Sequence, residues 1–360
     1  MKQYIIKLKN AIKVTSIGRY IMTIRREKKG KSVQKATQVL DKFYHGHEKK
    51  RILEDMLSCS QKYRLNYEEY FLYNFENKSD AERKQFISDS ERVTICELFN
   101  QPKNQIIFDD KGETAKTFKK FFGRQTAVFR GSKDIDSIRE FLLKHKRCIA
   151  KPLTSACGYG VKVINVNDEV DKIAHLLITN YCSGLSSGGI LEELIIQAEP
   201  MVSIHSQSVN TVRIPTVRLD DRVEIFQPFF RAGRGESIVD NGGAGGIICA
   251  LDEKTGKVIA AKDEKCQKYI VHPDTNFPLI GFTIPEWDKA VEFVEQLVQV
   301  VPSNRYTAWD LAYTSNGYVL VEANARGQFL SQIPLEYGFR SQVMQYFKEL
   351  NINYNGKVEI

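Results

Sequence analysis

The chain carries two acids and an amide on stretches that are otherwise apolar. The segment YTAWDLAYTSNGYVLVEANARGQ contains Asp310, Glu322 and Asn324. A turn at residues 315–317 separates the acids, so we expect Asp310 and Glu322 on paired strands of a hairpin. Because side chains alternate along a strand, Glu322 and Asn324 share one face. Polar groups in such a setting cost free energy unless something pairs with them.

Oxygen ligands of this kind favour a particular metal. Two carboxylates and an amide that converge suit Mg²⁺, which binds carboxylates together with substrate phosphates rather than an all-protein cage. The alternative, a pair of exposed strand acids, fits poorly with the apolar flanks AWDLA and VLV. The pattern therefore predicts a magnesium site at Asp310, Glu322 and Asn324.

A second stretch could bind phosphate. In CIAKPLTSACGYGVKVI, Lys151 ends an apolar strand, and a loop with Ser155, Gly158 and Gly160 leads into a second strand. Glycines let backbone N–H groups approach phosphate oxygens, and a strand-borne lysine supplies a fixed positive charge beside them. A glycine-rich hairpin without a ligand explains this pattern equally well.

The secondary structure that must position these residues changes along the chain, from helices to a mixture of strands and helices. Over residues 1–104 apolar residues recur mostly at three- and four-residue spacing, which predicts a basic, all-helical N-terminal region with a helix N-cap at Ser79-Asp80. After Pro102 we expect a strand at 104–111, helices at 112–123 and 137–146, and a strand at 147–153.

A β-rich part follows. Alternating strands flank a turn at Asp220-Asp221, and two further strands are expected at 245–252 and 257–261. A helix after Pro285 then leads into the acid-bearing hairpin. Strands and helices alternate without a strict βαβ order, so the predicted fold class is α+β with antiparallel sheets.

Length and composition exclude several protein classes. With 360 residues, 42% of them hydrophobic and 27% charged, the chain is typical of a soluble protein of two or three packed units. No stretch approaches the roughly 18 to 20 apolar residues of a membrane helix. Lysines also interrupt any secretory signal, which predicts a cytoplasmic location. The seven scattered cysteines lack a CxxC pair, which predicts reduced thiols.

Positive charge is concentrated at the N-terminus. Residues 1–50 hold fourteen Lys or Arg and three Asp or Glu, whereas the whole chain has a net charge of only +8. Residues 1–30 mix these cations with apolar residues, like a basic amphipathic helix on an anionic membrane surface. A solvated helix packed on its own domain is the alternative. No base-reading or base-stacking module follows, so we do not expect a nucleic-acid partner.

Together the motifs resemble the ATP-grasp superfamily over roughly residues 105–345. AWDLAYTSNGYVLVEAN resembles its metal-binding strands, and DDKGETAK resembles the Asp-Lys that opens its ATP-binding domain. The segments SVNTVRI, FRAGRGESIVDNGGAGGI and HPDT are most similar to the sugar-transfer-associated ATP-grasp family. The resemblance implies two α+β lobes that clasp ATP. We expect a lobe with the phosphate-binding lysines at 105–195 and a lobe with the metal-binding strands at 196–350.

The resemblance also implies ATP and Mg²⁺ as cofactors. Lys111 and Lys151 would contact the phosphates beneath the glycine loop. The segment DNGGAGG would lie near the triphosphate, and the segment ILEELI would be the hinge that holds adenine. In that hinge either Glu192 or Glu193 would accept the adenine amino group. The residues implied to bind the nucleotide are Lys111, Lys151, Ser155, Gly158, Gly160, Glu192, Glu193, Leu194, Ile195 and Asn241.

Members of the superfamily typically phosphorylate a carboxylate and let an amine or another nucleophile attack the acyl phosphate. Such a transfer needs cations around the phosphoryl group and donors for the developing oxyanion. EANARGQ resembles the biotin-carboxylase-like members, which implies that Arg326 faces the acceptor with Gln328 beside it. D-alanine:D-alanine ligases place an arginine where this chain has Ala308, so the resemblance to them is limited to ATP binding.

Further basic residues are candidates for binding the anionic substrate. Arg213, Arg231 and Arg234 could do so, or could lie on a solvated strand face, and His272 could line the acceptor pocket or cap a turn.

We therefore expect a Mg-ATP-dependent, ADP-forming carboxylate-amine ligase of glycan or cell-surface polysaccharide biosynthesis. Its substrates would be small-molecule or glycan-linked carboxylates and amines. A kinase acting on a sugar or polyol hydroxyl is the alternative. A non-catalytic nucleotide-binding module is a third reading, against which the intact acidic set argues.

Overall fold

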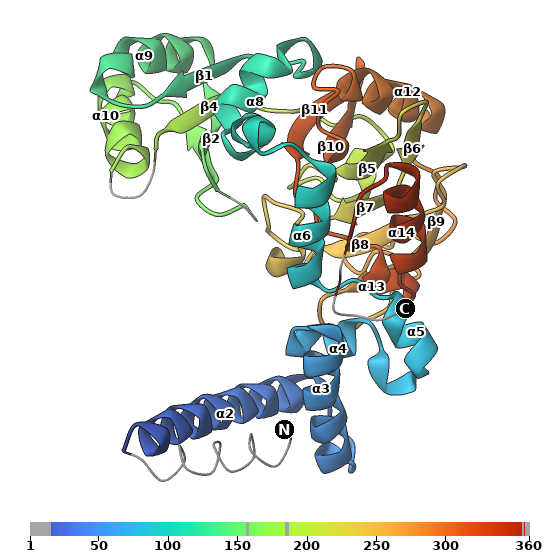
Figure 1. The fold of residues 1–360 in the computed structure, drawn as a ribbon. Coiled ribbons are helices and arrows are strands. Elements are labelled where there is room, and N and C mark those ends of the chain that lie inside the picture. The colour runs from blue at the N-terminus through green and yellow to red at the C-terminus, as the bar shows by residue number, and fades with distance from the viewer. Residues whose placement is uncertain (1–15, 156–157, 184–186, 355, 357–360) are drawn as a thin grey trace, which may run out of the picture. The chain divides into compact units, whose positions relative to one another are not determined.

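The computed structural model describes residues 16–155, 158–183, 187–354 and 356, and it divides the chain into two compact units, Met1–Ser79 and Asp80–Ile360 (Figure 1). The predicted division into parts at residues 104 and 195 stays a prediction. Six cysteines are free thiols, as expected, and Cys157 lies outside the described residues.

The first unit is helical where it is described. Its buried side chains include Ile52, Met56 and Tyr63, and Phe43 stacks on Phe71 with ring centroids 5.2 Å apart. Asn66 begins a helix with a capping box in which Glu69 accepts from the Asn66 backbone. The elements are α2 (Ser16–Phe43), α3 (Lys49–Tyr63), α4 (Tyr67–Leu72) and a 3₁₀ turn (Phe75–Asn77).

The second unit also begins with helices. They are α5 (Asp80–Gln85), α6 (Asp89–Phe99), α7 (Gln105–Asp109) and α8 (Lys111–Thr117), with 3₁₀ turns at Pro102–Asn104 and Lys119–Phe121. The strand predicted at 104–111 is therefore wrong. Asp110 explains why, because its carboxylate accepts from the backbone N–H groups of Gly112 and Glu113 and so caps α8 directly after α7 ends.

A four-stranded antiparallel sheet follows, with strand order β1-β4-β2-β3. Two helices cover one of its faces through Phe129, Phe141, Leu177 and Leu191. The strands are β1 (Thr126–Phe129), β2 (Arg147–Pro152), β3 (Lys162–Asn165) and β4 (Gly189–Glu193). The helices are α9 (Ile135–Lys144) and α10 (Val170–Tyr181), with a 3₁₀ turn at Ser132–Asp134 (Figure 1).

The second sheet has seven strands in the order β11-β10-β5-β7-β8-β9, with β6 paired to β5. All its pairs are antiparallel, which confirms the predicted α+β class. The strands are β5 (Val212–Arg218), β6 (Val223–Ile225), β7 (Phe229–Ala232), β8 (Ile247–Leu251), β9 (Val258–Asp263), β10 (Tyr306–Thr314) and β11 (Gly317–Asn324).

Each face of this second sheet has its own apolar core. The helix α12 packs on one face, where Trp309, Leu311 and Leu320 are buried. The other face packs on α6 and α14 through Tyr306, Ala308 and Val217. The remaining helices are α11 (Met201–Ile204), α12 (Trp287–Val298), α13 (Gln332–Leu335) and α14 (Arg340–Glu349), with a 3₁₀ turn at Gly242–Ala244.

A buried ion pair ties α14 to the helices that precede the sheets. Arg340 donates to both oxygens of Glu91 at 2.5 and 2.6 Å, and both side chains are 1% exposed. The same guanidinium donates to the carbonyls of Lys84 and Phe86, and Tyr354 donates to Glu91. Every charge in the cluster therefore has a partner, which is what a buried ion pair requires.

We expect Arg340→Met to destabilise the protein by about 3–5 kcal/mol, because it leaves Glu91 as an unpaired buried charge. Urea denaturation would measure the loss. Arg222→Met is the matched control, since Arg222 pairs with three carboxylates but is 42% exposed. Equal effects of the two substitutions would show that burial of the Glu91 pair contributes nothing.

Candidate active site

The predicted hairpin is present and brings charged residues into one row. Asp310 on β10 lies opposite Glu322 on β11 and opposite Arg213 on β5. Its neighbours along β10, Trp309 and Leu311, belong to the core on the other face. Alternation thus directs the apolar side chains to one face and the charges to the other.

Two arginines bind Asp310. Arg213 Nε and Nη2 donate to its two oxygens at 2.5 and 2.6 Å, and Arg231 Nη2 donates at 3.0 Å. Three of the roughly four acceptor positions of the carboxylate are thereby used. Burial alone would raise the pKa of Asp310, but the guanidinium groups outweigh burial and hold this pKa below its ordinary value.

Arg231 is held on its other side by a second acid. Its guanidinium donates to Thr211 Oγ1 at 2.7 Å and lies 3.5 Å from Asp240, which itself accepts from the hydroxyl and backbone N–H of Thr211. Arg213 and Arg231 are 6% and 13% exposed, so the solvated-face alternative is wrong for both. Arg234 differs, since it is 30% exposed and pairs with Asp263 and Tyr269.

Lys111 joins the start of α8 to β11. Its ammonium lies 3.1 Å from Glu322 Oε1 and donates to the carbonyl of Ser155 at 2.7 Å. The backbone N–H of Lys111 donates to Leu153, which fixes α8 beside the glycine loop. The structure therefore brings together Lys111, Ser155 and Glu322, three residues that the sequence had assigned to one site.

Asn324 has an unsatisfied amide next to these charges. Its Nδ2 is buried without a hydrogen-bond partner among the described residues, and a half-turn of the amide would put the carbonyl oxygen there instead. That oxygen and the carboxylate of Glu322 fit a hard cation such as Mg²⁺. No cluster of three His, Cys, Asp or Glu that could hold a metal occurs in the part of the chain that is described.

On the first sheet, Lys151 and Glu192 form the corresponding charged pair. Their side chains alternate with residues of the core under α9 and α10, and Lys151 Nζ lies 3.0 Å from Glu192 Oε2. Arg124 binds the same oxygen at 2.7 Å. Burial alone would raise the pKa of Glu192, but Arg124 and Lys151 lower it to about 2. Sequence reasoning missed Arg124, which stands in the loop before β1 and belongs to no recognisable motif.

The glycine loop approaches the segment at Asn241. A Cβ at Gly158, whose φ is +70°, would lie 2.9 Å from Asn241 Nδ2, so no other residue fits there without a shift. Asn241 in turn caps the Gly242–Ala244 turn by accepting from the backbone of Ala244. Two segments predicted to contact the triphosphate therefore lie together, while residues 156–157 of the loop lie outside the described residues.

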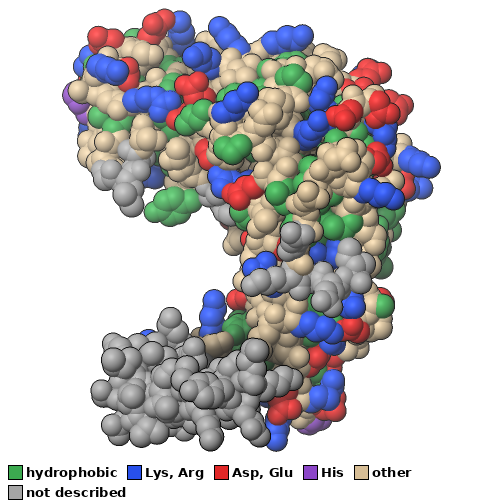
Figure 2. Space-filling model, viewed as in Figure 1, with side chains coloured by type: hydrophobic (Ala, Val, Ile, Leu, Met, Phe, Trp, Pro, Cys, Tyr) green, Lys and Arg blue, Asp and Glu red, His purple; other side chains and the backbone are tan. Residues whose placement is uncertain are grey.

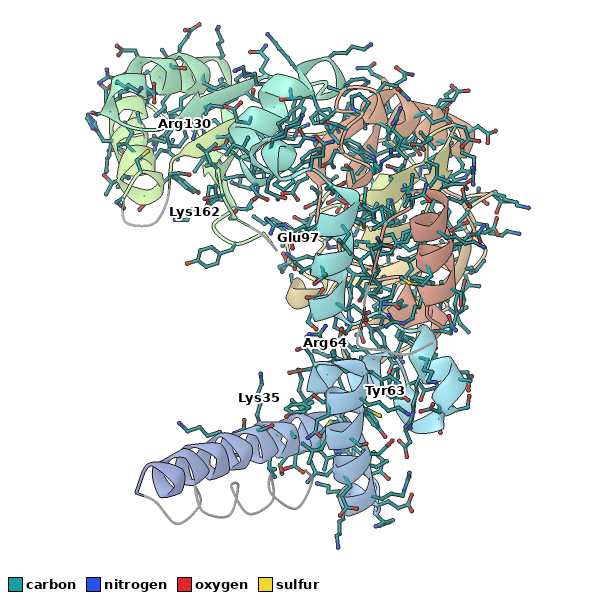
Figure 3. The ribbon with its side chains drawn as sticks, in the orientation of Figure 1. Lys35, Tyr63, Arg64, Glu97, Arg130 and Lys162 are labelled. Carbon is teal, nitrogen blue, oxygen red and sulfur yellow. The ribbon has the colours of Figure 1, made fainter. Side chains whose placement is uncertain are left out.

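Arg326 lies beyond the strand that carries Glu322 and Asn324. The strand ends at Asn324, and residue 326 belongs to the turn that follows. Arg326 is 38% exposed and pairs with Asp109 at 2.9 Å and with Glu97 at 3.5 Å. Glu97, labelled in Figure 3, lies on α6. The role of Arg326 toward an acceptor stays a prediction.

His272 is buried and holds a turn. Its Nε2 donates to the carbonyl of Gly233 at 2.7 Å, and burial lowers its pKa, which favours the neutral ring. This geometry favours the turn-capping interpretation. In the segment predicted to be the adenine hinge, Leu194 and Ile195 follow β4 and are half-buried. The carboxylate of Glu193 accepts from the backbone N–H of Gln125 at 3.2 Å.

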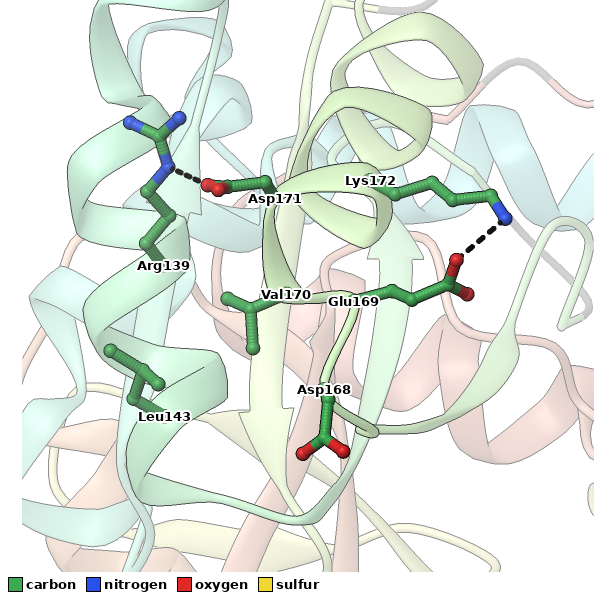
Figure 4. Close-up of a pocket in the computed structure, with 7 residues that line it drawn as sticks. All are labelled: Arg139, Leu143, Asp168, Glu169, Val170, Asp171 and Lys172. Atoms are coloured by element: carbon green, nitrogen blue, oxygen red, sulfur yellow. Dashed lines mark hydrogen bonds and ion pairs between the residues drawn. The ribbon is translucent and has the colours of Figure 1, made fainter.

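The surface hollow between two helices is separate from the charged residues described above. A shallow hollow of about 440 Å³ between α9 and α10 is lined by Leu143, Val170 and the ion pairs of Arg139 and Lys172, which Figure 4 labels. It contains none of the predicted site residues. On the face shown in Figure 2, acidic and basic side chains are interspersed over the two-sheet unit. No helix among the described residues is long and apolar enough to span a membrane.

The lowered pKa of Glu192 predicts a pH-dependent stability. A carboxylate whose pKa falls from 4.5 to about 2 on folding stabilises the protein fully above pH 4.5 and loses this contribution as the pH falls toward 2. Its size is about 3 kcal/mol. The difference in unfolding free energy between wild type and Glu192→Gln should therefore be constant near neutral pH and shrink below about pH 4.5.

Urea denaturation over a pH series tests this expectation. Glu140→Gln is the control, because Glu140 pairs with Lys144 on the exposed side of α9. A wild-type-minus-Glu192→Gln difference that does not vary with pH would contradict the assignment of the titration to Glu192.

The chain matches both solved structures and a protein family. Among solved structures, the D-alanine-D-alanine ligase from Helicobacter pylori is 13% identical, covering 74% of this chain and 70% of its own, with a TM-score of 0.45. The ATP-grasp ligase PsnB, solved with a minimal precursor, Mg and ADP, is 12% identical over 70% of this chain with a TM-score of 0.40, and this chain spans 62% of its length.

At these sequence identities and TM-scores, the similarity says nothing about the activity or the substrate of this chain. No curated protein matched the sequence. The profile of the sugar-transfer associated ATP-grasp family, in contrast, matches residues 90–348, which include both sheets and every residue of the candidate site. The predicted resemblance is confirmed: the chain belongs to the sugar-transfer associated ATP-grasp family and has the ATP-grasp fold.

Proposed function

We propose that the protein is a Mg-ATP-dependent, ADP-forming ligase that activates a carboxylate as an acyl phosphate for attack by an amine or another nucleophile. The observation that carries the proposal is the convergence on one sheet face of Glu322, Asn324 and Asp310 with the cations Lys111, Arg213 and Arg231. Acids for a metal and fixed cations for a phosphoryl group are what phosphoryl transfer to a carboxylate needs.

The nucleotide would lie between the charged faces of the two sheets. Lys111 and Lys151 would bind its phosphates, and Ser155, Gly158 and Gly160 would cover them beside Asn241. The backbone at Leu194 and Ile195 would hold adenine, with Glu192 or Glu193 accepting its amino group. Glu192 already binds two cations, which leaves Glu193 the acid with fewer charged partners.

Glu322 and Asn324 would hold Mg²⁺, and Asp310 would contribute through the acceptor position that its arginines leave open. A magnesium ion bound there would neutralise the charge on the phosphates during transfer. Lys111 would then turn from Glu322 toward a phosphate oxygen. An ammonium is a point charge on a flexible stem, so this movement requires no rearrangement of the backbone.

Arg213 and Arg231 would stabilise the developing oxyanion. Arg213 binds Asp310 through Nε and Nη2, and Arg231 binds Thr211 and Asp310 through the same two nitrogens. Among the described residues, Nη1 of neither arginine makes a hydrogen bond. These Nη1 groups are therefore free to donate to an acyl phosphate. Arg326, at the turn after β11, is the candidate for binding the acceptor substrate.

The proposed substrate class has less support than the proposed nucleotide and metal residues. A role in cell-surface polysaccharide or glycan biosynthesis, with small-molecule or glycan-linked carboxylate and amine substrates, is supported by the family's description alone. We place the enzyme in the cytoplasm, where ATP is supplied. A kinase that phosphorylates a sugar or polyol hydroxyl is the second candidate, because it would use the same nucleotide and metal residues.

Release of ADP and phosphate against a panel of uronic acids, amino acids and sugars tests the proposal. A ligase releases both products in equal amounts when carboxylate and nucleophile are present, whereas a kinase releases ADP without phosphate. Glu322→Gln should abolish ADP release with every acceptor. Arg326→Ala should keep ATP affinity while acceptor-dependent ADP release falls about tenfold or more, because the acceptor substrate loses a charged hydrogen bond.

Arg139→Ala is the control, because Arg139 makes its ion pairs on α9 and α10. If Arg326→Ala weakens ATP binding as much as Glu322→Gln does, Arg326 belongs to the nucleotide site. The acceptor site would then have to be sought around Arg231.

We also propose that residues 1–30, with nine Lys or Arg and one Glu, contact anionic membrane lipids. Residues 1–15 lie outside the described residues, so the support is the charge pattern alone. Attraction of about 1 kcal/mol per basic residue should make binding to phosphatidylserine vesicles salt-sensitive in co-sedimentation. Equal sedimentation with neutral and anionic vesicles would contradict the proposal.

A further inference from the structure

Arg124 is a buried arginine that joins the two sheets. Its side chain is 3% exposed, and its Nε and Nη2 lie 2.8 and 2.7 Å from Glu192 Oε2 on β4 of the first sheet. On the second sheet, Nη1 donates to the carbonyl of Leu320 at 2.6 Å and Nη2 to that of Val321 at 3.3 Å. Both carbonyls belong to β11, the edge strand that carries Glu322.

The carbonyls that Arg124 binds lie at a β-bulge. Asp310 pairs with Glu322 but the next residue, Leu311, pairs with Leu320, so Val321 is an extra residue without a partner on β10. The burial pattern of β11 shows the consequence. Tyr318 and Leu320 are buried before the bulge and Ala323 after it, so the inward-facing positions change from even to odd numbers.

The bulge decides which way the metal residues point. In a regular register from Leu320 onward, Val321 would stand opposite Asp310, and Glu322 would share the core-facing side with Leu320. With the bulge, Glu322 and Asn324 lie on the face of Asp310. A bulge leaves ladder groups unpaired, and on an edge strand only a side chain or water can satisfy them. Arg124 supplies that side chain.

Arg124 also keeps Glu192 paired with a cation if Lys151 moves away to bind another group. Lys151 and Arg124 bind the same oxygen of Glu192. If Lys151 turns toward a phosphate, Glu192 keeps the arginine, and no buried carboxylate is left unpaired. One guanidinium thus connects the phosphate-binding lysine of the first sheet with the bulge that orients the metal acid of the second.

We propose that Arg124 is a positioning residue that holds the β11 bulge in register, and so sets the metal affinity of Glu322 and Asn324 without itself contacting nucleotide or metal. The proposal rests on the proposed function as a Mg-ATP site. It differs from a general role in stability because it predicts separate effects on metal binding and on nucleotide binding.

Arg124→Lys is the informative substitution. Lysine keeps a positive charge for Glu192, but one ammonium cannot bind Glu192 and the two carbonyls of β11 together. Titration calorimetry would measure ADP binding to the protein and then Mg²⁺ binding to the ADP complex. We expect nearly unchanged ADP affinity and Mg²⁺ affinity lower by about 10-fold or more, as for loss of an outer partner of a metal ligand.

Amide hydrogen exchange supplies a readout that needs no ligand. In Arg124→Lys the amides of Glu322 and Ala323 should exchange faster, while those of β8 should not change. Arg139→Lys is the control, since Arg139 binds the carboxylates of Asp136 and Asp171, which lie on α9 and α10. If Arg124→Lys does not fold, the double variant Arg124→Gln with Glu192→Gln takes its place, because it removes both charges of the pair. The single variant Glu192→Gln is then the reference for the double variant in the same measurements.

Equal losses of ADP and Mg²⁺ affinity, or no loss of either, would overturn the positioning role. If the wild-type protein binds no Mg²⁺-ADP, the proposed function fails, and the exchange rates alone decide on Arg124. Faster exchange confined to the end of β11 would then support its positioning role, and unchanged exchange would refute it.

Discussion

The candidate site depends on the neutralisation of its carboxylates by cations from other elements. Asp310 on β10 is held by Arg213 of β5 and Arg231 of β7. Glu322 is held by Lys111 at the start of α8, and Glu192 by Arg124 and Lys151. A buried carboxylate without a partner costs several kcal/mol, so Asp310 and Glu192 require their cations to be in place, whereas Glu322 is 35% exposed. Because the cations come from different elements, the pairs tie the two sheets and α8 together.

Arginines and lysines have different roles in this arrangement. The arginines bind with planar, multi-donor geometry, as Arg213 does to both oxygens of Asp310. The lysines bind Glu322 and Glu192 through single ammonium groups on flexible stems. Under the proposed function the arginines form the frame of the site, and the lysines are the groups that can exchange a carboxylate for a phosphate.

The apolar residues determine on which face of the second sheet the charged side chains lie. Trp309, Leu311 and Leu320 bury one face of the second sheet against α12, and strand alternation then directs Asp310 to the other face. Beyond Asp310, that face carries Ala308 and Tyr306 into the core formed with α6 and α14. The charged row therefore stands at the edge of an apolar core, in a setting of low dielectric where electrostatic interactions are stronger than in water.

The sequence by itself determined the local features: the helical start, the hairpin around residues 315–317, the antiparallel α+β class, and the lysines and acids of the family motifs. These follow from short-range periodicity, turn chemistry and residue type. Tertiary structure alone decided the rest. Residues 105–109 form a helix in place of the predicted strand, β11 ends before Arg326, and Arg124 binds a bulge almost 200 residues away. A regular hairpin that pairs Thr314 with Gly317 would have set Val321, and not Glu322, opposite Asp310. The bulge that corrects this register is stabilised by long-range contacts, and such contacts leave no local pattern in the sequence because their partners meet only in the folded chain.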